Sequence, residues 1–179
     1  MVDAPTESAV LVPIPEVEPL VARHRADLDP SSRWGVPAHV TVLYPFVAPR
    51  EITTATISVL AEVTASVPAF EFEFRRTRRF GREVLWLAPE PAEPFRALTA
   101  AVSSAFPQHP PYGGVFDDVI PHLTIGDSPP DGTSALDRAE HDVRAHLPVT
   151  ATVREVWLMA GDRTPQSWHR LARLPLSGS

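Results

Sequence analysis

Two histidine–threonine pairs are the residues of this sequence best suited to joint acid–base chemistry. His39 and Thr41 lie in the apolar run AHVTVLYPF, and His122 and Thr124 lie in the similar run PHLTIGD. Residues i and i+2 of a strand project from the same face, so each pair would present an imidazole and a hydroxyl together. The aliphatic residues that alternate with them would point to the opposite face, toward a core.

Two imidazoles that meet at one cleft suit the opening of a phosphodiester ring. Near their ordinary pKa of about 6.5, two histidines can hold opposite protonation states at neutral pH. One then deprotonates the nucleophile and the other protonates the leaving oxygen. The threonine hydroxyls can donate to the non-bridging phosphate oxygens as charge builds on them. This scheme needs no metal ion, so we expect neither a metal nor another cofactor.

Three other interpretations compete with the paired-histidine hypothesis. A single His-x-Thr is common, and either pair alone reads as structural strand residues. A zinc site needs three or four convergent ligands; Asp117, Asp118 and Asp127 lie near His122, but nothing comparable lies near His39. A catalytic triad needs an activated serine, and no Gly-x-Ser-x-Gly occurs. Repetition of the pair in two similar strands favours the paired-histidine hypothesis.

The elements around the two pairs follow the same order twice. Each half of the chain reads β-α-β-α-β with the histidine strand in the middle, which predicts an α+β fold made by internal duplication. We expect one domain over residues 1–179, built of two lobes at about 8–80 and 83–176 around a central cleft; a single sheet with a coincidental order is the alternative. Expected strands are 8–14, 37–46, 69–80, 83–88, 119–127, 149–160 and 167–176, and expected helices are 16–28, 51–66, 92–106 and 134–147.

Composition excludes several classes of protein. The 179 residues fit one domain, and the net charge of −6 argues against a protein that coats nucleic acid. The absence of cysteine excludes disulfides and thiolate sites. The N-terminus lacks the basic start of a signal peptide, and no apolar stretch is long enough to cross a membrane. We therefore expect a cytoplasmic monomer that binds a small substrate and no membrane.

The segments GVPAHVTVLYPF and VIPHLTIGD resemble the 2H phosphoesterase superfamily, in particular its bacterial 2′-5′ RNA ligase-like branch, and the resemblance covers nearly the whole chain. It implies a duplicated α+β fold with antiparallel sheets. It also implies metal-independent phosphodiesterase chemistry on 2′,3′-cyclic phosphates or 2′-5′-linked nucleotides and RNA ends. The catalytic residues would be His39, Thr41, His122 and Thr124, with His39 as the leaving-group acid and His122 as the base. RNA ligation, or binding of a nucleotide without turnover, remains open.

Three further residues are candidates for substrate binding. Nucleotide bases stack on aromatic side chains, which suggests Tyr112 in the loop before His122 and Trp168 on the last expected strand. Arg79 lies in RRTRRFGRE, the densest positive stretch, and could contact a phosphate. The alternative for this stretch is a solvated strand end balanced by nearby glutamates.

Overall fold

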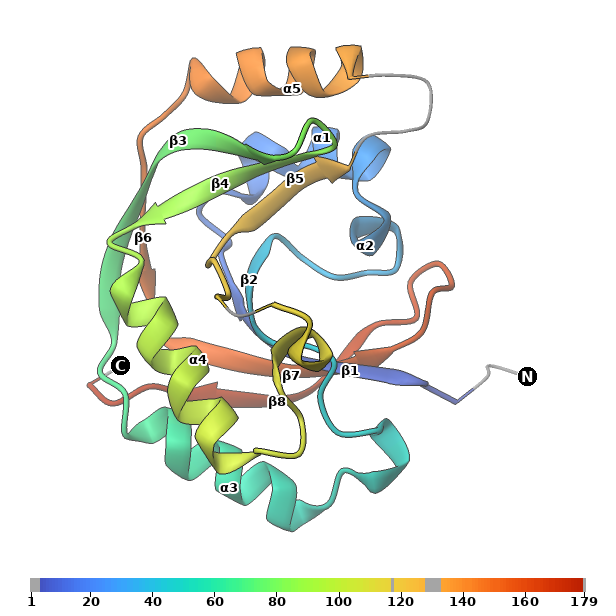
Figure 1. Cartoon of the computed structure of the whole chain (residues 1–179), viewed down its shortest axis with the longest axis vertical. Helices are drawn as coiled ribbons and strands as arrows, with labels where there is room; N and C mark the ends of the chain where they lie inside the picture. The colour runs from blue at the N-terminus through green and yellow to red at the C-terminus, as the bar shows by residue number, and fades with distance from the viewer. Residues whose placement is uncertain (1–3, 117, 128–132, 179) are drawn as a thin grey trace.

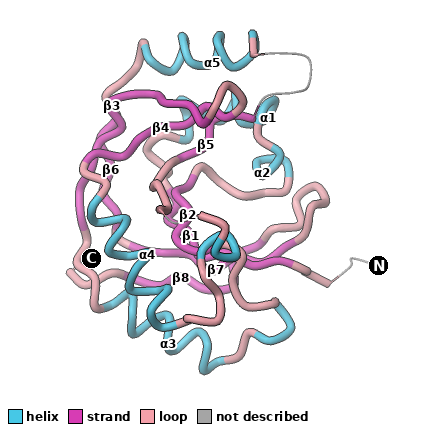
Figure 2. The backbone as a smooth tube through the Cα atoms, viewed as in Figure 1, coloured by secondary structure: helices cyan, strands magenta, loops and turns pink. Residues whose placement is uncertain are grey.

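The computed structural model describes residues 4–116, 118–127 and 133–178. Strands of two sheets occupy the middle of the molecule, and helices lie at its two ends (Figure 2). Short 3₁₀ helices lie at Pro49–Glu51 and Pro111–Gly114. The α-helices are α1 (Glu18–Leu28), α2 (Pro30–Arg33), α3 (Thr54–Ala65), α4 (Glu93–Ala105) and α5 (Ser134–Arg144). The strands are β1 (Glu7–Pro13), β2 (His39–Leu43), β3 (Phe70–Phe80), β4 (Val84–Glu90), β5 (Leu123–Asp127), β6 (Val149–Val153), β7 (Glu155–Gly161) and β8 (His169–Pro175).

The two sheets have matching strand orders. One runs β2-β1-β7-β8 and the other β5-β4-β3-β6, and all neighbouring strands are antiparallel. β2, which begins with His39, and β5, which follows His122, hold the same edge position in their respective sheets. These two edge strands contact each other near the centre of the molecule (Figure 1). The expected α+β fold with two related antiparallel sheets is confirmed.

The helices that precede the two histidine strands are exchanged between the sheets. α1 connects β1 to β2 but packs on β5 of the other sheet, and α4 connects β4 to β5 but packs near β2. Figure 1 accordingly shows α1 and α5 at one end and α3 and α4 at the other. A Cβ at Gly126 of β5 would lie 2.6 Å from the Leu28 Cβ of α1, so glycine permits this close approach. Each histidine strand therefore packs against the helix that precedes the histidine strand of the other sheet.

Two sequence-based boundaries differ from the structure. The sheets do not divide the chain at 8–80 and 83–176, because β3 pairs with β4 and β6 whereas β7 lies between β1 and β8. The expected strand 149–160 is two strands, since the ladder stops at Arg154 and β6 and β7 belong to different sheets. Local periodicity predicts that a segment is extended, but it does not say which sheet the segment joins.

Buried and exposed side chains alternate in the first half of β3, and the buried ones join the core next to α4. Phe72 and Phe74 are buried, whereas the nearby Glu71 is exposed. The Phe72 ring lies 5.0 Å from the Phe74 ring and 4.9 Å from the ring of Phe95 in α4.

No helix in the described ranges is both long enough and apolar enough to cross a membrane.

Candidate functional site

The main chain holds both motif histidines in the same way. The Nδ1 atom of His39 lies 2.7 Å from the carbonyl oxygen of Pro37, and that of His122 lies 2.7 Å from the carbonyl oxygen of Ile120. A carbonyl only accepts, so Nδ1 carries the proton in each bond. Nε2 of each ring is then the atom available for proton transfer.

Each histidine begins or immediately precedes an edge strand that buries its aliphatic residues. Val40 and Val42 of β2 are buried, as are Leu123 and Ile125 of β5. The side chains that alternate with them, those of the two His-x-Thr pairs, are all partly exposed. The alternation expected from the sequence is present in both strands.

The two imidazoles lie close enough for their charges to interact. Burial, the positive charge of Arg25 and, to a smaller extent, a proton on His122 lower the pKa of His39 to about 4, against the hydrogen bond to Pro37 and the charge of Asp29, which raise it. Burial also lowers the pKa of His122, against the hydrogen bond to Ile120, which raises it. At neutral pH both rings are therefore neutral in the free protein. An anionic phosphate bound between them would favour protonation of one ring.

Tyr112, a candidate from the sequence, lies beside the first motif. Burial raises the pKa of its phenol, and the Thr41 hydroxyl, which lies beside it, lowers that pKa by a smaller amount. Its main-chain N–H donates to the carbonyl of Tyr44 at 2.6 Å. Tyr112 adopts a φ of 52°, a left-handed conformation that is uncommon outside glycine. The loop before His122 thus reaches across to β2 and positions a phenol at Thr41.

The structure does not bring Arg79 or Trp168 to the histidine pair. The Arg79 guanidinium lies 2.7 Å from Asp137 and 2.8 Å from Glu140, both on α5, so this cation fastens a helix to β3. Trp168 is only 8% exposed, and its Nε1 donates to the Asp162 carbonyl at 2.8 Å. It packs over the β1–β7 strands, where it leaves little surface on which a base could stack.

A buried arginine next to His39 was missed in the sequence. The Arg25 side chain is 1% exposed, and its guanidinium lies 2.9 Å from Asp29. Its Nη1 is buried without a hydrogen-bond partner among the described residues. The helical periodicity could have indicated this arginine, because Arg25 follows Val21 by four residues and both are on the buried side of α1.

Two aromatic rings that the sequence analysis did not single out line the surroundings of His122. The His122 ring meets Phe80 edge to face at 5.0 Å and Trp86 at 5.8 Å. Phe80 and Trp86 stack on each other at 4.6 Å. His122 therefore borders an aromatic surface provided by β3 and β4.

The described acidic residues of the alternative zinc hypothesis form no metal site with His122. The Asp118 carboxylate lies 2.5 Å from the Arg96 guanidinium, and Asp117 lies outside the described residues. Within the described ranges, no three His, Cys, Asp or Glu side chains are placed to hold one metal ion.

Comparison with known proteins agrees with this architecture. A family model described as the 2′-5′ RNA ligase superfamily matches residues 13–165. Comparison with curated protein sequences gives no significant match. Among solved structures, the protein TT0787 of Thermus thermophilus is similar, with a TM-score of 0.68 and 19% identity over 97% of this chain and 99% of that one.

Escherichia coli LigT without ligand is also similar, with a TM-score of 0.63 and 17% identity over 98% of this chain and 99% of LigT. LigT has also been solved in complexes with 3′-AMP and with phosphate. A further structure described as a phosphoesterase matches with a TM-score of 0.60 and 17% identity over 97% and 99% of the two chains. At these identities the solved structures establish the likeness of fold alone.

Proposed function

Because the chain belongs to the 2′-5′ RNA ligase superfamily, we propose that it is a phosphodiesterase that acts on 2′,3′-cyclic phosphates or 2′-5′-linked nucleotides and RNA ends. The observation that carries the proposal is that the edge strands β2 and β5 contact each other, and that His39 and His122 on them are held by equivalent hydrogen bonds. A single phosphoryl group between the two Nε2 atoms would have a proton acceptor on one side and a donor on the other.

Arg25 supports a division of labour between the two histidines. Its positive charge disfavours a proton on His39, whereas burial is what lowers the pKa of His122. When a phosphate binds, His122 would therefore take the proton more readily. In ring opening, His39 would then deprotonate the attacking water and His122 would protonate the leaving oxygen. This assignment is the reverse of the one that the family resemblance implies.

The two threonines would bind the non-bridging oxygens of the phosphate. Thr124 has a partly exposed hydroxyl on the face of its strand that His122 shares. Thr41 is likewise partly exposed, on the face of its strand that His39 shares, with Tyr112 beside it. Such donors stabilise charge that grows in the transition state. With a 5′-hydroxyl in place of water as the nucleophile, the same groups would open the cyclic phosphate to form a 2′-5′ bond, and the reverse of that step would cleave such a bond.

We further propose a monomer in the cytoplasm that handles small nucleotides or RNA ends. The net charge of −6 does not suit a long polyanionic ligand, and the absence of cysteine fits a reducing compartment.

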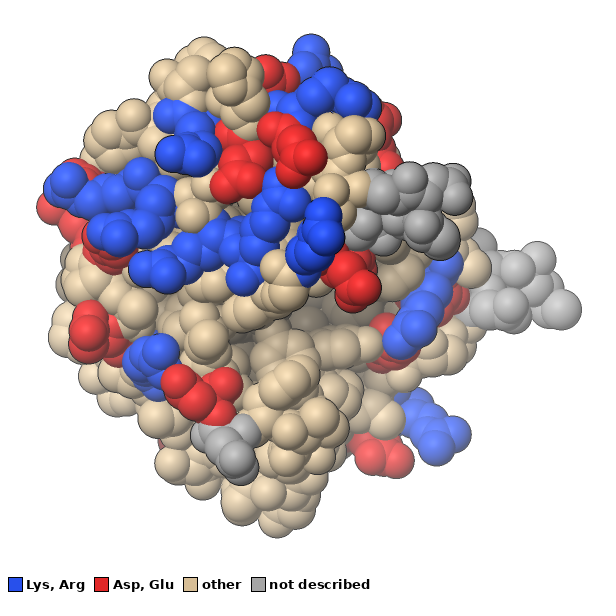
Figure 3. Space-filling model, turned by 45° about the horizontal axis from the view of Figure 1, so that its top comes forward, with Lys and Arg blue, Asp and Glu red and all other residues tan. Residues whose placement is uncertain are grey.

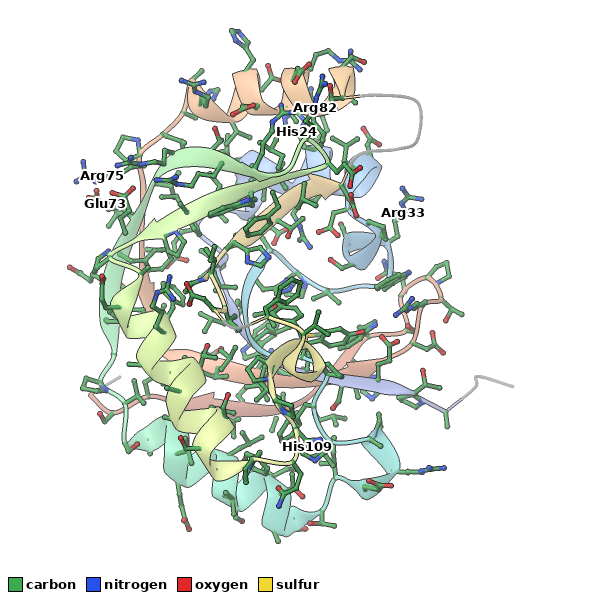
Figure 4. All side chains as sticks on the ribbon, viewed as in Figure 1. His24, Arg33, Glu73, Arg75, Arg82 and His109 are labelled. Carbon is green, nitrogen blue, oxygen red and sulfur yellow. The ribbon has the colours of Figure 1, made fainter. Side chains whose placement is uncertain are left out.

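Replacement of either histidine tests the proposed function. We expect His39→Ala and His122→Ala each to slow hydrolysis of a 2′,3′-cyclic nucleotide by at least about 10²-fold, because each removes one proton-transfer group. His109→Ala is the matched control; it removes an imidazole that packs against Phe46, with ring centroids 5.9 Å apart, in a different part of the molecule (Figure 4). EDTA should not change the rate.

Wild-type rates in both motif variants, or an activity that a chelator abolishes, would refute the proposal. Tight binding of cyclic nucleotides with no product over hours would instead indicate a protein that binds nucleotides without turning them over.

A further inference from the structure

Two cavities of similar size occupy corresponding places in the two halves of the fold. A cavity of about 530 Å³ is lined by Pro37 and Ala38, the two residues before His39. A second cavity, of about 550 Å³, is lined by Ile120 and Pro121, the two residues before His122. We call them the His39-side and His122-side cavities. Each is large enough for part of a nucleotide.

The charges that line the two cavities are opposite in balance. Three arginines and two acidic residues line the His122-side cavity, namely Arg78, Arg79, Arg96, Glu90 and Asp118. Two arginines and three acidic residues line the His39-side cavity, namely Arg154, Arg173, Glu16, Glu18 and Glu155. An anionic part of a ligand should therefore favour the His122 side.

Arg78 is responsible for the positive excess on the His122 side. β3 carries four arginines, and three of them have acidic partners: Arg75 with Glu73 at 2.6 Å, Arg76 with Glu90 at 2.7 Å, and Arg79 with Asp137 and Glu140. Arg78 is exposed and has no ion pair or hydrogen bond to a described residue. Figure 3 shows arginines gathered in a band above the hollow of this face; the chain contains no lysine.

Strand register places Arg78 on the same face as the second motif. Arg78 pairs with Trp86 across β3 and β4, and Trp86 pairs with Thr124 across β4 and β5. Directly paired residues share a face, and two strand spacings of about 4.8 Å separate Arg78 from Thr124 by roughly 10 Å. At this distance the Arg78 backbone is not next to a phosphate held at Thr124. The Arg78 guanidinium is therefore suited to bind a second anionic group that lies beside that phosphate.

The surface between Arg78 and Thr124 suits a nucleotide. Trp86 and Phe80 both line the cavity, and their stacked rings border His122. Trp86 is only 4% exposed, so it supports the more exposed Phe80 ring that stacks on it rather than offering a face of its own to a ligand.

We propose that the His122-side cavity binds a second phosphate of the substrate through Arg78, with the attached nucleoside against Phe80, the partly exposed ring that stacks on Trp86. The inference rests on the proposed function and makes it more specific. The preferred substrate is then a cyclic nucleotide that also carries a 5′-phosphate, as the last residue of an RNA chain does.

Binding of two product-like nucleotides tests the proposal without any need for turnover. Adenosine 2′,5′-bisphosphate carries both phosphates, and 2′-AMP carries only the one that would lie between the histidines. We expect the wild-type protein to bind the bisphosphate about tenfold more tightly by calorimetry, since a charge-assisted hydrogen bond contributes about 1.5 kcal/mol or more. Arg78→Gln should abolish this difference and leave the affinity for 2′-AMP unchanged.

Arg75→Gln is the matched control. Arg75 is an arginine of the same strand that forms an ion pair with Glu73, and neither residue lines the cavity. Both side chains are labelled in Figure 4, and the loss of Arg75 should leave the tenfold difference in place. Equal binding of both nucleotides by the wild type, or an intact difference in Arg78→Gln, would overturn the proposal. Failure of the proposed function would be seen separately, as wild-type hydrolysis rates in His39→Ala and His122→Ala.

Discussion

Each motif histidine uses one ring nitrogen to hold its position and leaves the other for chemistry. The carbonyl oxygens of Pro37 and Ile120 fix the tautomer, so Nε2 of each ring can accept or donate a proton without reorientation. Because the two imidazoles lie close together in a partly buried site, protonation of both rings at once is unfavourable. These two effects together favour a site in which one proton is shared between two rings.

The low pKa of His39 makes folding stability depend on pH. Its folded pKa of about 4 lies below the ordinary 6.5, so between these values the unfolded chain binds a proton that the folded protein does not. Stability from this residue is therefore fully present above pH 6.5 and falls as the pH drops toward 4.

We expect wild type to lose roughly 1–2 kcal/mol more than His39→Gln in the free energy of unfolding between pH 7 and pH 5. Urea denaturation at the two pH values measures the loss, with the exposed His169→Gln as the comparison variant. An equal loss in wild type and His39→Gln would show that His39 titrates normally.

At the scale of the elements, Arg25 connects α1 to the segment that leads into β2. Its guanidinium bonds to Asp29, which caps α2 by accepting from the Ser31 main chain at 3.0 Å, and to the carbonyl of Val36 at 3.3 Å. The strand that begins with His39 thus starts from a fixed position. The same arginine supplies the charge that lowers the pKa of that histidine.

Arg25→Met should destabilise the protein by about 3–5 kcal/mol, because it leaves the buried Asp29 carboxylate without its partner. Arg23→Met is the matched control on the same helix. It removes an ion pair with Asp142 in which the Arg23 side chain is 80% exposed, and it should cost about 1 kcal/mol or less. Chemical denaturation measures both.

The double variant Arg25→Met/Asp29→Asn should regain part of the loss, since it removes the unpaired charge and keeps the cap. Equal stability of Arg25→Met and Arg23→Met would contradict this role for Arg25.

The elements also explain which site residues the sequence could reveal. The two His-x-Thr pairs are short repeated patterns in strands whose alternation is local, so their positions and faces could be predicted. The sequence analysis chose Arg79 from RRTRRFGRE as the candidate for phosphate binding. In the structure it is Arg78 that lies on the same sheet face as Thr124. A bulge between Phe74 and Arg76 inverts the alternation in the second half of β3, and no local pattern signals it.

At the scale of the whole molecule, both the symmetry and the departures from it bear on function. The two sheets have the same strand order, and their edge strands β2 and β5 contact each other. The sequence predicted this long-range contact only through the repeated order of elements in its two halves. The exchange of α1 and α4 between the sheets, and the passage of the chain from β6 to β7, could not be anticipated because they depend on contacts remote in sequence. The charge around the two flanking cavities breaks the symmetry and would orient a substrate.

The most direct test of the central claim is a crystal structure of the complex with 2′-AMP. We predict that the 2′-phosphate lies between the two edge strands, with Nε2 of His39 and Nε2 of His122 each within about 3 Å of an oxygen of that same phosphate. A phosphate held by one imidazole alone, with the other ring turned away from it, would contradict the account.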